Sequence, residues 1–126
     1  MEDDKIVLAY QLTRATGNLE AVSEVLADDV EFIRGGRTPV RGKHAVLEYL
    51  ARIYQAFPDL ATEVKHIIAQ GDTVALETVV TGTHQGMLEV TSDGQGLPPT
   101  GQQINTPTAV FLTIRDGHIV RWQMYN

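Results

Sequence analysis

The first half of the chain carries apolar residues at the spacing of amphipathic helices. Acidic residues precede the apolar stretch IVLAYQL, and acids in a first turn complement the helix dipole, so the sequence predicts a helix over about residues 3–15. Asn18 can cap a second, short helix whose apolar positions recur at helical spacing. A third helix with one apolar face is expected over about residues 43–56, and Pro58 stops it.

The second half alternates between apolar and polar positions, which is the period of a half-buried strand. Gly71-Asp72 and Asp116-Gly117 have turn chemistry and divide this half into two predicted hairpins. Between the hairpins lie the turn-forming groups Ser92-Asp93-Gly94 and Pro98-Pro99, which suit either a small extra hairpin or a mobile flap. The predicted strands are residues 29–34, 61–70, 73–84, 103–115 and 118–125. Helices followed by a run of antiparallel strands indicate an α+β fold with the helices on one face of the sheet.

Composition excludes several classes of protein. The chain has 126 residues, which fits one domain with one core, so we expect a single domain over residues 1–126. There is no apolar run of about 18 residues and no basic segment at the start of the chain, so no membrane segment and no signal peptide are expected, and we expect a cytoplasmic protein. The net charge is −6 and no basic stripe appears, which argues against nucleic acid as a partner.

Metal and cofactor sites are not expected either. Cysteine is absent, and His44 and His66 have no acidic partner at metal-ligand spacing, so we assign no metal. The chain has neither a phosphate-binding loop nor a dinucleotide fingerprint, so we expect no cofactor.

Four ordered motifs together resemble one family. They are AFPDL at 56–60, GDTVALETVVTGTHQG at 71–86, GLPPTG at 96–101 and RDGHIVRW at 115–122. The sequence is similar, from about Asn18 to its end, to the SnoaL-like polyketide cyclases of the nuclear transport factor 2-like superfamily. The resemblance implies an α+β cone in which a curved antiparallel or mixed sheet wraps around three N-terminal helices and a deep, mostly apolar pocket. It also implies a homodimer formed through the outer face of the sheet.

The resemblance further selects the strand faces that would line this pocket. On the last strand the selected face carries Val120, Trp122, Met124 and Asn126, although a bulge would turn part of a face outward. The residues expected to contact a hydrophobic small molecule are Phe32, Tyr54, Thr78, Val80, Thr108, Val110, Trp122, Met124 and Asn126. If the chain ends at Asn126, the α-carboxylate of that residue could lie near the pocket mouth, but the chain could equally continue.

The proton-transferring residues of two related mechanisms are replaced here. The aspartate that SnoaL-like cyclases use as general acid and base falls on Met124, and a family histidine falls on Val110. The arginine and two aspartates of limonene-type epoxide hydrolases fall on Thr78, Val80 and Met124. An apolar cavity with a few hydroxyl groups favours a large hydrophobic ligand.

Two side chains are left as candidate catalytic residues. A tyrosine of the ketosteroid isomerases matches Tyr10, while the base of those enzymes falls near Arg34 and their second acid near Val110. The Tyr10 hydroxyl could polarise a carbonyl, and His84 could move a proton near neutral pH. Either side chain could instead be structural, with Tyr10 in the core and His84 ordering the turn GTHQG.

Two functions from different classes follow from these observations. The first is a SnoaL-like enzyme of secondary metabolism that cyclises, isomerises or dehydrates a polyketide- or terpenoid-like substrate by positioning it next to Tyr10 and His84. The second is a non-catalytic protein that binds a hydrophobic ligand, which Met124, Val110 and Val80 favour. An interaction module is a third possibility, for which the sequence offers no large exposed apolar stripe.

Asp59 is expected to organise the loop after the third helix rather than to catalyse a reaction.

Overall fold

The structure is a computed structural model that describes residues 2–89 and 96–126. Within these residues the helices are α1 (Glu2–Arg14), α2 (Leu19–Val25) and α3 (Lys43–Ala56). The strands are β1 (Leu26–Arg34), β2 (Val40–Arg41), β3 (Ala61–Gln70), β4 (Thr73–Thr83), β5 (Leu88–Glu89), β6 (Gly96–Leu97), β7 (Gln103–Arg115) and β8 (His118–Tyr125). The predicted helices and the two predicted hairpins are therefore confirmed.

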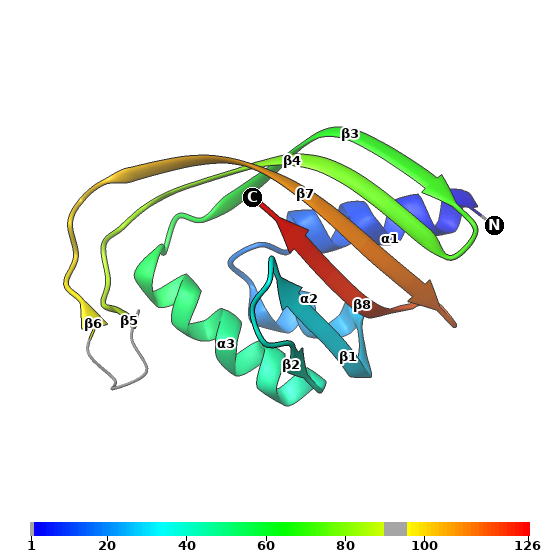
Figure 1. Ribbon diagram of the computed structural model, residues 1–126, viewed down its shortest axis with the longest axis horizontal. Coiled ribbons are helices and arrows are strands. Elements are labelled where there is room, and N and C mark those ends of the chain that lie inside the picture. Colours follow the sequence, from blue (N-terminus) through cyan, green and yellow to red (C-terminus); the bar gives the residue numbers. More distant parts are fainter. Residues whose placement is uncertain (1, 90–95) are drawn as a thin grey trace.

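The main sheet is mixed and strongly curved. Its strand order is β2-β1-β8-β7-β4-β3, in which β1 runs parallel to β8 and the other neighbours are antiparallel. All three helices that the described residues form lie on the concave side of this sheet, and β4 and β7 arch over the end of α3 (Figure 1). The α+β cone that the resemblance implies is thus the observed fold.

Local sequence signals explain where the second and third helices begin. The side chain of Asn18 accepts a hydrogen bond of 3.1 Å from the Ala21 amide, which satisfies an amide that the first turn of α2 leaves without a partner. Gly42 precedes α3 with a φ of +91°, a backbone conformation that glycine adopts without strain. Val46 and Leu50 then form the buried face of α3.

The core fills the space between the helices and the concave face of the sheet. Ala9 of α1, Val22 of α2 and Val46 of α3 are fully buried and meet Leu112 of β7 in one apolar cluster. The cluster also includes Leu12, Phe32, Leu50 and Trp122, which line the cavity described below.

An irregularity in the last hairpin moves one residue of the predicted pocket face outward. The pairing of β7 with β8 shifts between Thr113 and Ile114, so that Ile114 lies opposite Ile119. As a result Ile119 is fully buried and Val120 is only half-buried. Strict alternation of side chains along the strand, counted back from Trp122, predicted that Val120 faces the cavity. The alternation holds from Trp122 onward, beyond the shift.

The segment between the two long hairpins forms a small hairpin in its described part. Leu88 pairs with Leu97, and Glu89 with Gly96, as β5 and β6. The predicted turn at Ser92-Asp93-Gly94 lies outside the described residues.

Strand β2, which pairs with Glu31 and Phe32 of β1, was not predicted because the loop GGRTPVRG contains mainly turn-forming residues.

Asp59 joins the loop after α3 to the end of β4, as the sequence predicted. One carboxylate oxygen accepts a hydrogen bond of 2.7 Å from the Thr83 amide, and the other accepts one of 2.8 Å from the Thr83 hydroxyl. These two hydrogen bonds lower the pKa of Asp59 below its ordinary value of 3.8, because both stabilise the charged form. The loop is therefore held most firmly when Asp59 is ionised.

We expect Asp59→Asn to destabilise the protein near neutral pH and to have a smaller effect in acid. A carboxyl group whose pKa is lowered on folding stabilises the folded state at every pH above its ordinary pKa. This contribution is lost as the pH falls through the lowered pKa of the folded state. Urea unfolding of the two proteins at pH 7 and at pH 3 measures the difference. Asp29→Asn is the control, because Asp29 is exposed and accepts no side-chain hydrogen bond from the described residues. An effect of Asp59→Asn that is equal at both pH values would contradict the expectation.

Candidate functional site

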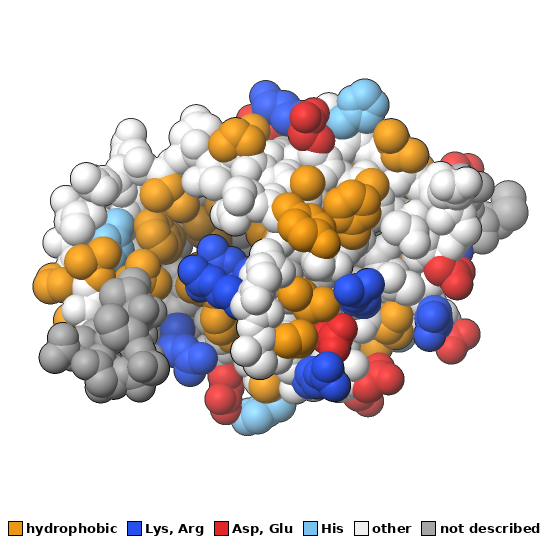
Figure 2. All heavy atoms as spheres, in the orientation of Figure 1, with side chains coloured by type: hydrophobic (Ala, Val, Ile, Leu, Met, Phe, Trp, Pro, Cys, Tyr) orange, Lys and Arg blue, Asp and Glu red, His pale blue; other side chains and the backbone are white. Residues whose placement is uncertain are grey.

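The candidate site is a cavity of about 290 Å³ that borders the core cluster, since Leu12, Phe32, Leu50 and Trp122 belong to both. It lies between α3, the end of α1 and the concave face of β1, β4, β7 and β8, and most of its lining is apolar. On the face of the molecule in Figure 2, a hollow is visible beside apolar side chains and a group of basic side chains. The volume corresponds to roughly ten water molecules, and lies at the lower end of the range of ligand pockets.

Most of the residues that the sequence selected as ligand contacts line this cavity. They are Phe32, Tyr54, Val80, Thr108, Trp122, Met124 and Asn126. Phe32 and Trp122 are paired across β1 and β8, and their rings lie edge to face with centroids 4.7 Å apart. The Phe32 ring also lies 5.6 Å from that of Tyr49 on α3. These three rings form one aromatic wall of the cavity.

Thr78 and Val110 do not line the cavity, although both lie on the concave face of the sheet. Thr78 is 1% exposed, and its hydroxyl donates a hydrogen bond of 3.1 Å to the Thr108 carbonyl. Val110 is 7% exposed and belongs to the core cluster. Thr78 pairs with Thr108, which does line the cavity, whereas Val110 pairs with Leu76, another member of the core cluster.

The hydroxyl groups on the cavity wall are mostly engaged with the protein. Thr108 donates a hydrogen bond of 3.3 Å to the Thr106 carbonyl, and the hydroxyls of Thr16 and Thr62 are 2.9 Å apart. Burial raises the pKa of Tyr54, and a hydrogen bond from the Gly17 backbone lowers it by less. Tyr54 therefore keeps its proton at neutral pH and is a wall residue with a partner of its own.

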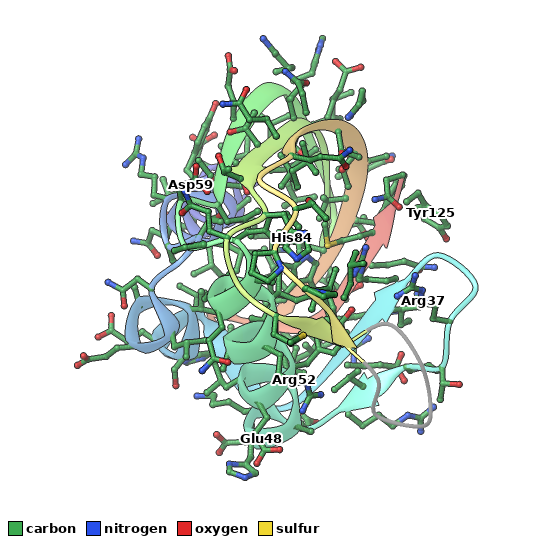
Figure 3. The ribbon with its side chains drawn as sticks, turned by 90° about the vertical axis from the view of Figure 1, so that its left-hand side faces the viewer. Arg37, Glu48, Arg52, Asp59, His84 and Tyr125 are labelled. Atoms are coloured by element: carbon green, nitrogen blue, oxygen red, sulfur yellow. The ribbon has the colours of Figure 1, made fainter. Side chains whose placement is uncertain are left out.

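Neither predicted catalytic side chain lines the cavity. Tyr10 is half-buried, and the guanidinium of Arg14 lies 5.7 Å from the centre of its ring. His84 is 4% exposed, and its ring lies 5.4 Å from that of Phe57, which does line the cavity. In Figure 3 His84 lies beside the end of α3.

His84 instead connects the end of β4 to the segment before β7. Its amide donates to the Gln102 carbonyl and its carbonyl accepts from the Gly101 amide, both at 2.9 Å. Its Nδ1 is hydrogen-bonded to the Thr100 hydroxyl at 3.0 Å. Its Nε2 is the one buried side-chain nitrogen or oxygen without a partner in the described part of the chain. These contacts support the structural interpretation, in which His84 orders the turn GTHQG.

The cavity also contains a charged side chain that the sequence analysis did not select. Arg34, at the end of β1, lines the cavity and donates a hydrogen bond of 2.9 Å from Nη1 to the hydroxyl of Tyr49. None of the lining side chains that the structure describes is a carboxylate. The available signal was strand parity, since Arg34 is two residues beyond Phe32 and therefore on the same face.

The described residues form neither a metal-ligand cluster nor a membrane-spanning helix. In residues 2–89 and 96–126 no group of three or more histidine, aspartate or glutamate side chains could hold a metal ion. No helix of this part of the chain is both long and apolar enough to span a bilayer.

Comparison with known proteins supports the assignment of the fold and provides a family. A model of the SnoaL-like polyketide cyclase family matches residues 4–126. A protein from Jannaschia sp. CCS1, proposed to be a SnoaL-like polyketide cyclase, has a structure with a TM-score of 0.84 at 21% identity, covering 98% of this chain and 85% of that chain. No curated protein sequence matches the chain.

Two further structures show how broad the similarity is. IdmH from Streptomyces antibioticus, proposed to be a polyketide cyclase, is 28% identical with a TM-score of 0.72, and 94% of this chain and 88% of IdmH are covered. An epoxide hydrolase of the LEH-like type from M. tuberculosis is 17% identical with a TM-score of 0.77, and 98% of this chain and 83% of that chain are covered. The same fold thus carries different reactions, and the reaction must be argued from the cavity.

Proposed function

Because the chain belongs to the SnoaL-like polyketide cyclase family, we propose that it is a small-molecule enzyme of the cyclase type that acts on a hydrophobic substrate in its cavity. The observation that supports this most directly is the cavity itself, with its aromatic wall and few polar groups. Such a cavity holds a flexible apolar substrate in one conformation and excludes water, which favours cyclisation, isomerisation or dehydration. The polyketide- or terpenoid-like nature of the substrate and its place in secondary metabolism are part of this proposal.

The catalytic roles of Tyr10 and His84 stay predictions. Both side chains lie outside the lining of the cavity, so a direct role would require a substrate that reaches beyond it. The proposed function therefore depends on the cavity and not on these two residues.

A non-catalytic ligand-binding protein is the second candidate. It is favoured by Met124, which lines the cavity at the position where the resemblance expects the catalytic aspartate. A thioether is a soft, adaptable contact for an irregular apolar ligand and cannot transfer a proton. The two candidate functions differ in the molecule that leaves the cavity. A binding protein releases its ligand unchanged, whereas an enzyme releases a product.

Native mass spectrometry after incubation with an extract of the source organism distinguishes the two. Chromatography of the released ligand then compares it with the components of the extract. A bound or released species with a new mass, or with the mass of an extract component but a different retention time, is expected for the enzyme. A ligand carried unchanged, with no product in the supernatant, would identify the binding protein. The control is Ile104→Trp, which fills the cavity and should retain neither species.

The outer face of the sheet supports a proposed homodimer. Phe111 of β7 and Tyr125 of β8 are 44% and 45% exposed, and their rings lie edge to face at 6.0 Å. Ile68 on β3 is also exposed, and Figure 2 shows apolar side chains gathered on this face. Exposed apolar groups of this kind on a sheet mark a contact surface.

We expect Phe111→Asp to convert the dimer into a monomer. A carboxylate in the middle of an apolar contact would lose its hydration without gaining a partner, which costs several kcal/mol, on the order of 3. Native mass spectrometry of the two proteins at equal concentration measures the subunit count. Val7→Asp is the matched control, because Val7 is an exposed apolar residue on α1 rather than on the sheet. A wild-type protein that is monomeric at all concentrations, or a Phe111→Asp variant that stays dimeric, would contradict this interface.

A further inference from the structure

Arg34 is held at one precise position inside the cavity. It ends β1, lies opposite Met124 of the parallel strand β8, and is half-buried. The amide of Gly35 donates a hydrogen bond of 2.8 Å to the Met124 carbonyl, so the two strands stay paired as far as this point. Because paired residues on neighbouring strands share a face, the side chains of Arg34 and Met124 both reach the cavity.

No carboxylate of the described residues forms a salt bridge with Arg34. Glu31, the nearest acidic residue along β1, lies on the outer face, where Arg41 and Arg121 approach it at 3.2 Å and 3.7 Å. The salt bridges among the described side chains do not include Arg34. An arginine is charged at every pH at which proteins fold, and a charge beside an apolar wall is costly unless it gains a partner.

Tyr49 adds a hydroxyl donor to the N–H donors of Arg34. Its hydroxyl oxygen accepts the hydrogen bond from Arg34 Nη1 at 2.9 Å, so its own proton is free to point elsewhere. The remaining guanidinium N–H groups form a planar fork of the kind that binds both oxygens of a carboxylate. Arg34 and Tyr49 therefore present several N–H and O–H donors on a wall that is mostly aromatic or aliphatic and otherwise carries threonine and asparagine side chains.

We propose that the cavity binds a hydrophobic carboxylate, whose anionic group is held by Arg34 and Tyr49. The apolar body lies against Phe32 and Trp122, and the carboxylate faces the guanidinium in place of the acid that is absent at Met124. This inference rests on the proposed function in one respect, namely that the cavity is the ligand site. It adds the substrate class, since an apolar cavity alone would favour a neutral ligand.

The volume of the cavity limits the body of the ligand. About 290 Å³ accommodates a molecule of one or two fused rings with a short side chain. A ring system of this size packs between the aromatic wall and the aliphatic residues Leu12, Ile53 and Val80. The carboxylate must lie toward the end of β1, because Arg34 is the cationic residue of the described lining.

Two probes of equal shape test the proposal, namely 2-naphthoate and its neutral amide, 2-naphthamide. Isothermal titration calorimetry on the full chain is expected to give tighter binding of the anion by about tenfold to hundredfold, as for a hydrogen bond to a charged group. Arg34→Met should bring the two affinities to within about threefold of one another while leaving that of the amide nearly unchanged. Tyr49→Phe, which removes one donor and keeps the ring, should lower the preference by about twofold to tenfold.

Arg37→Met is the matched control. Arg37 lies on the exposed loop after β1 and outside the lining, so this variant removes the same charge without touching the cavity (Figure 3). It should keep the preference of the wild-type protein, and a loss equal to that in Arg34→Met would overturn the proposal. Should Arg34→Met not fold, Tyr49→Phe and Arg34→Lys, which keeps the charge but loses the fork, still test it.

The outcomes separate the two levels of inference. Equal affinity of the wild-type protein for both probes, or a preference that survives in Arg34→Met, overturns the carboxylate site but leaves the cavity as the ligand site. If neither probe shows saturable binding, both the carboxylate site and the cavity as a ligand site are overturned. A preference lost only in Arg34→Met and reduced in Tyr49→Phe supports both.

Discussion

Replacing Met124 by aspartate should abolish the preference of the cavity for anionic ligands. Met124 lies opposite Arg34 on the neighbouring strand, and strands in a sheet are about 4.8 Å apart, so the new carboxylate would lie within reach of the guanidinium. It would occupy the position that we assign to the ligand's carboxylate and would repel any second anion. We expect binding of 2-naphthoate to weaken by about tenfold to hundredfold and binding of 2-naphthamide to change little.

The same variant should not acquire a general acid. The guanidinium of Arg34 would hold the pKa of the new carboxyl well below its usual range, because an opposite charge at this distance favours the ionised form. An aspartate restored at position 124 could therefore act as a general acid only if Arg34 is removed as well.

Met124→Leu and Met124→Asn provide the controls for this experiment. Leucine keeps the apolar wall, and asparagine has the shape of aspartate without its charge, so both should retain the preference for the anion. Calorimetry on the three variants with both probes makes the comparison. A Met124→Asp protein that still prefers the anion would show that Arg34 does not face residue 124 in solution.

Among the glycine-to-alanine replacements in the described part of the chain, Gly86→Ala should lower the free energy of unfolding the most. A Cβ atom at this position would lie 2.0 Å from the carbonyl oxygen of Gln55, which belongs to the backbone of α3 and cannot rotate away. The loop would have to move, and the hydrogen bonds of Gln85 and Gly86 to the Ala56 carbonyl, at 2.9 Å and 3.1 Å, would be strained. We expect a loss of about 1–3 kcal/mol.

Thermal unfolding measured by circular dichroism tests this expectation. The midpoint should fall by roughly 4–12 °C, because 1 kcal/mol corresponds to about 4 °C in a chain of this length. Gly36→Ala is the matched control, since a Cβ there meets nothing within 4 Å and the φ of Gly36 is not positive. A Gly86→Ala protein as stable as Gly36→Ala would mean that the loop does not pack against α3 as described. The effect should extend to ligand binding, because Leu88, two residues further on, lines the cavity.

The order of helices and strands could be predicted because it depends on local signals. Asn18 caps α2 as expected, and the turns at Gly71-Asp72 and Asp116-Gly117 join the strands as expected. The parallel pairing of β1 with β8 could not be predicted, because it joins segments about 90 residues apart and no turn residue marks it. The family resemblance supplied the cone that contains this pairing.

Arg34 was missed for the same reason. A charged residue at the end of a predicted strand, followed by two glycines, is usually solvated. Strand parity places Arg34 on the face of Phe32, but only the register with β8 shows that Arg34 lies next to Met124. The register shift near Ile114 had the opposite effect, since it moved Val120 off a face on which simple alternation had placed it.

The aromatic wall gives the protein an intrinsic optical reporter. Trp122 is the only tryptophan of the chain, it lies in the lining of the cavity, and its ring meets that of Phe32 edge to face. The tryptophan emission of the protein therefore arises entirely from an indole that lines the cavity. A change in the wavelength or intensity of that emission would signal occupancy without a label, so that libraries of colourless compounds could be screened directly on the unmodified protein.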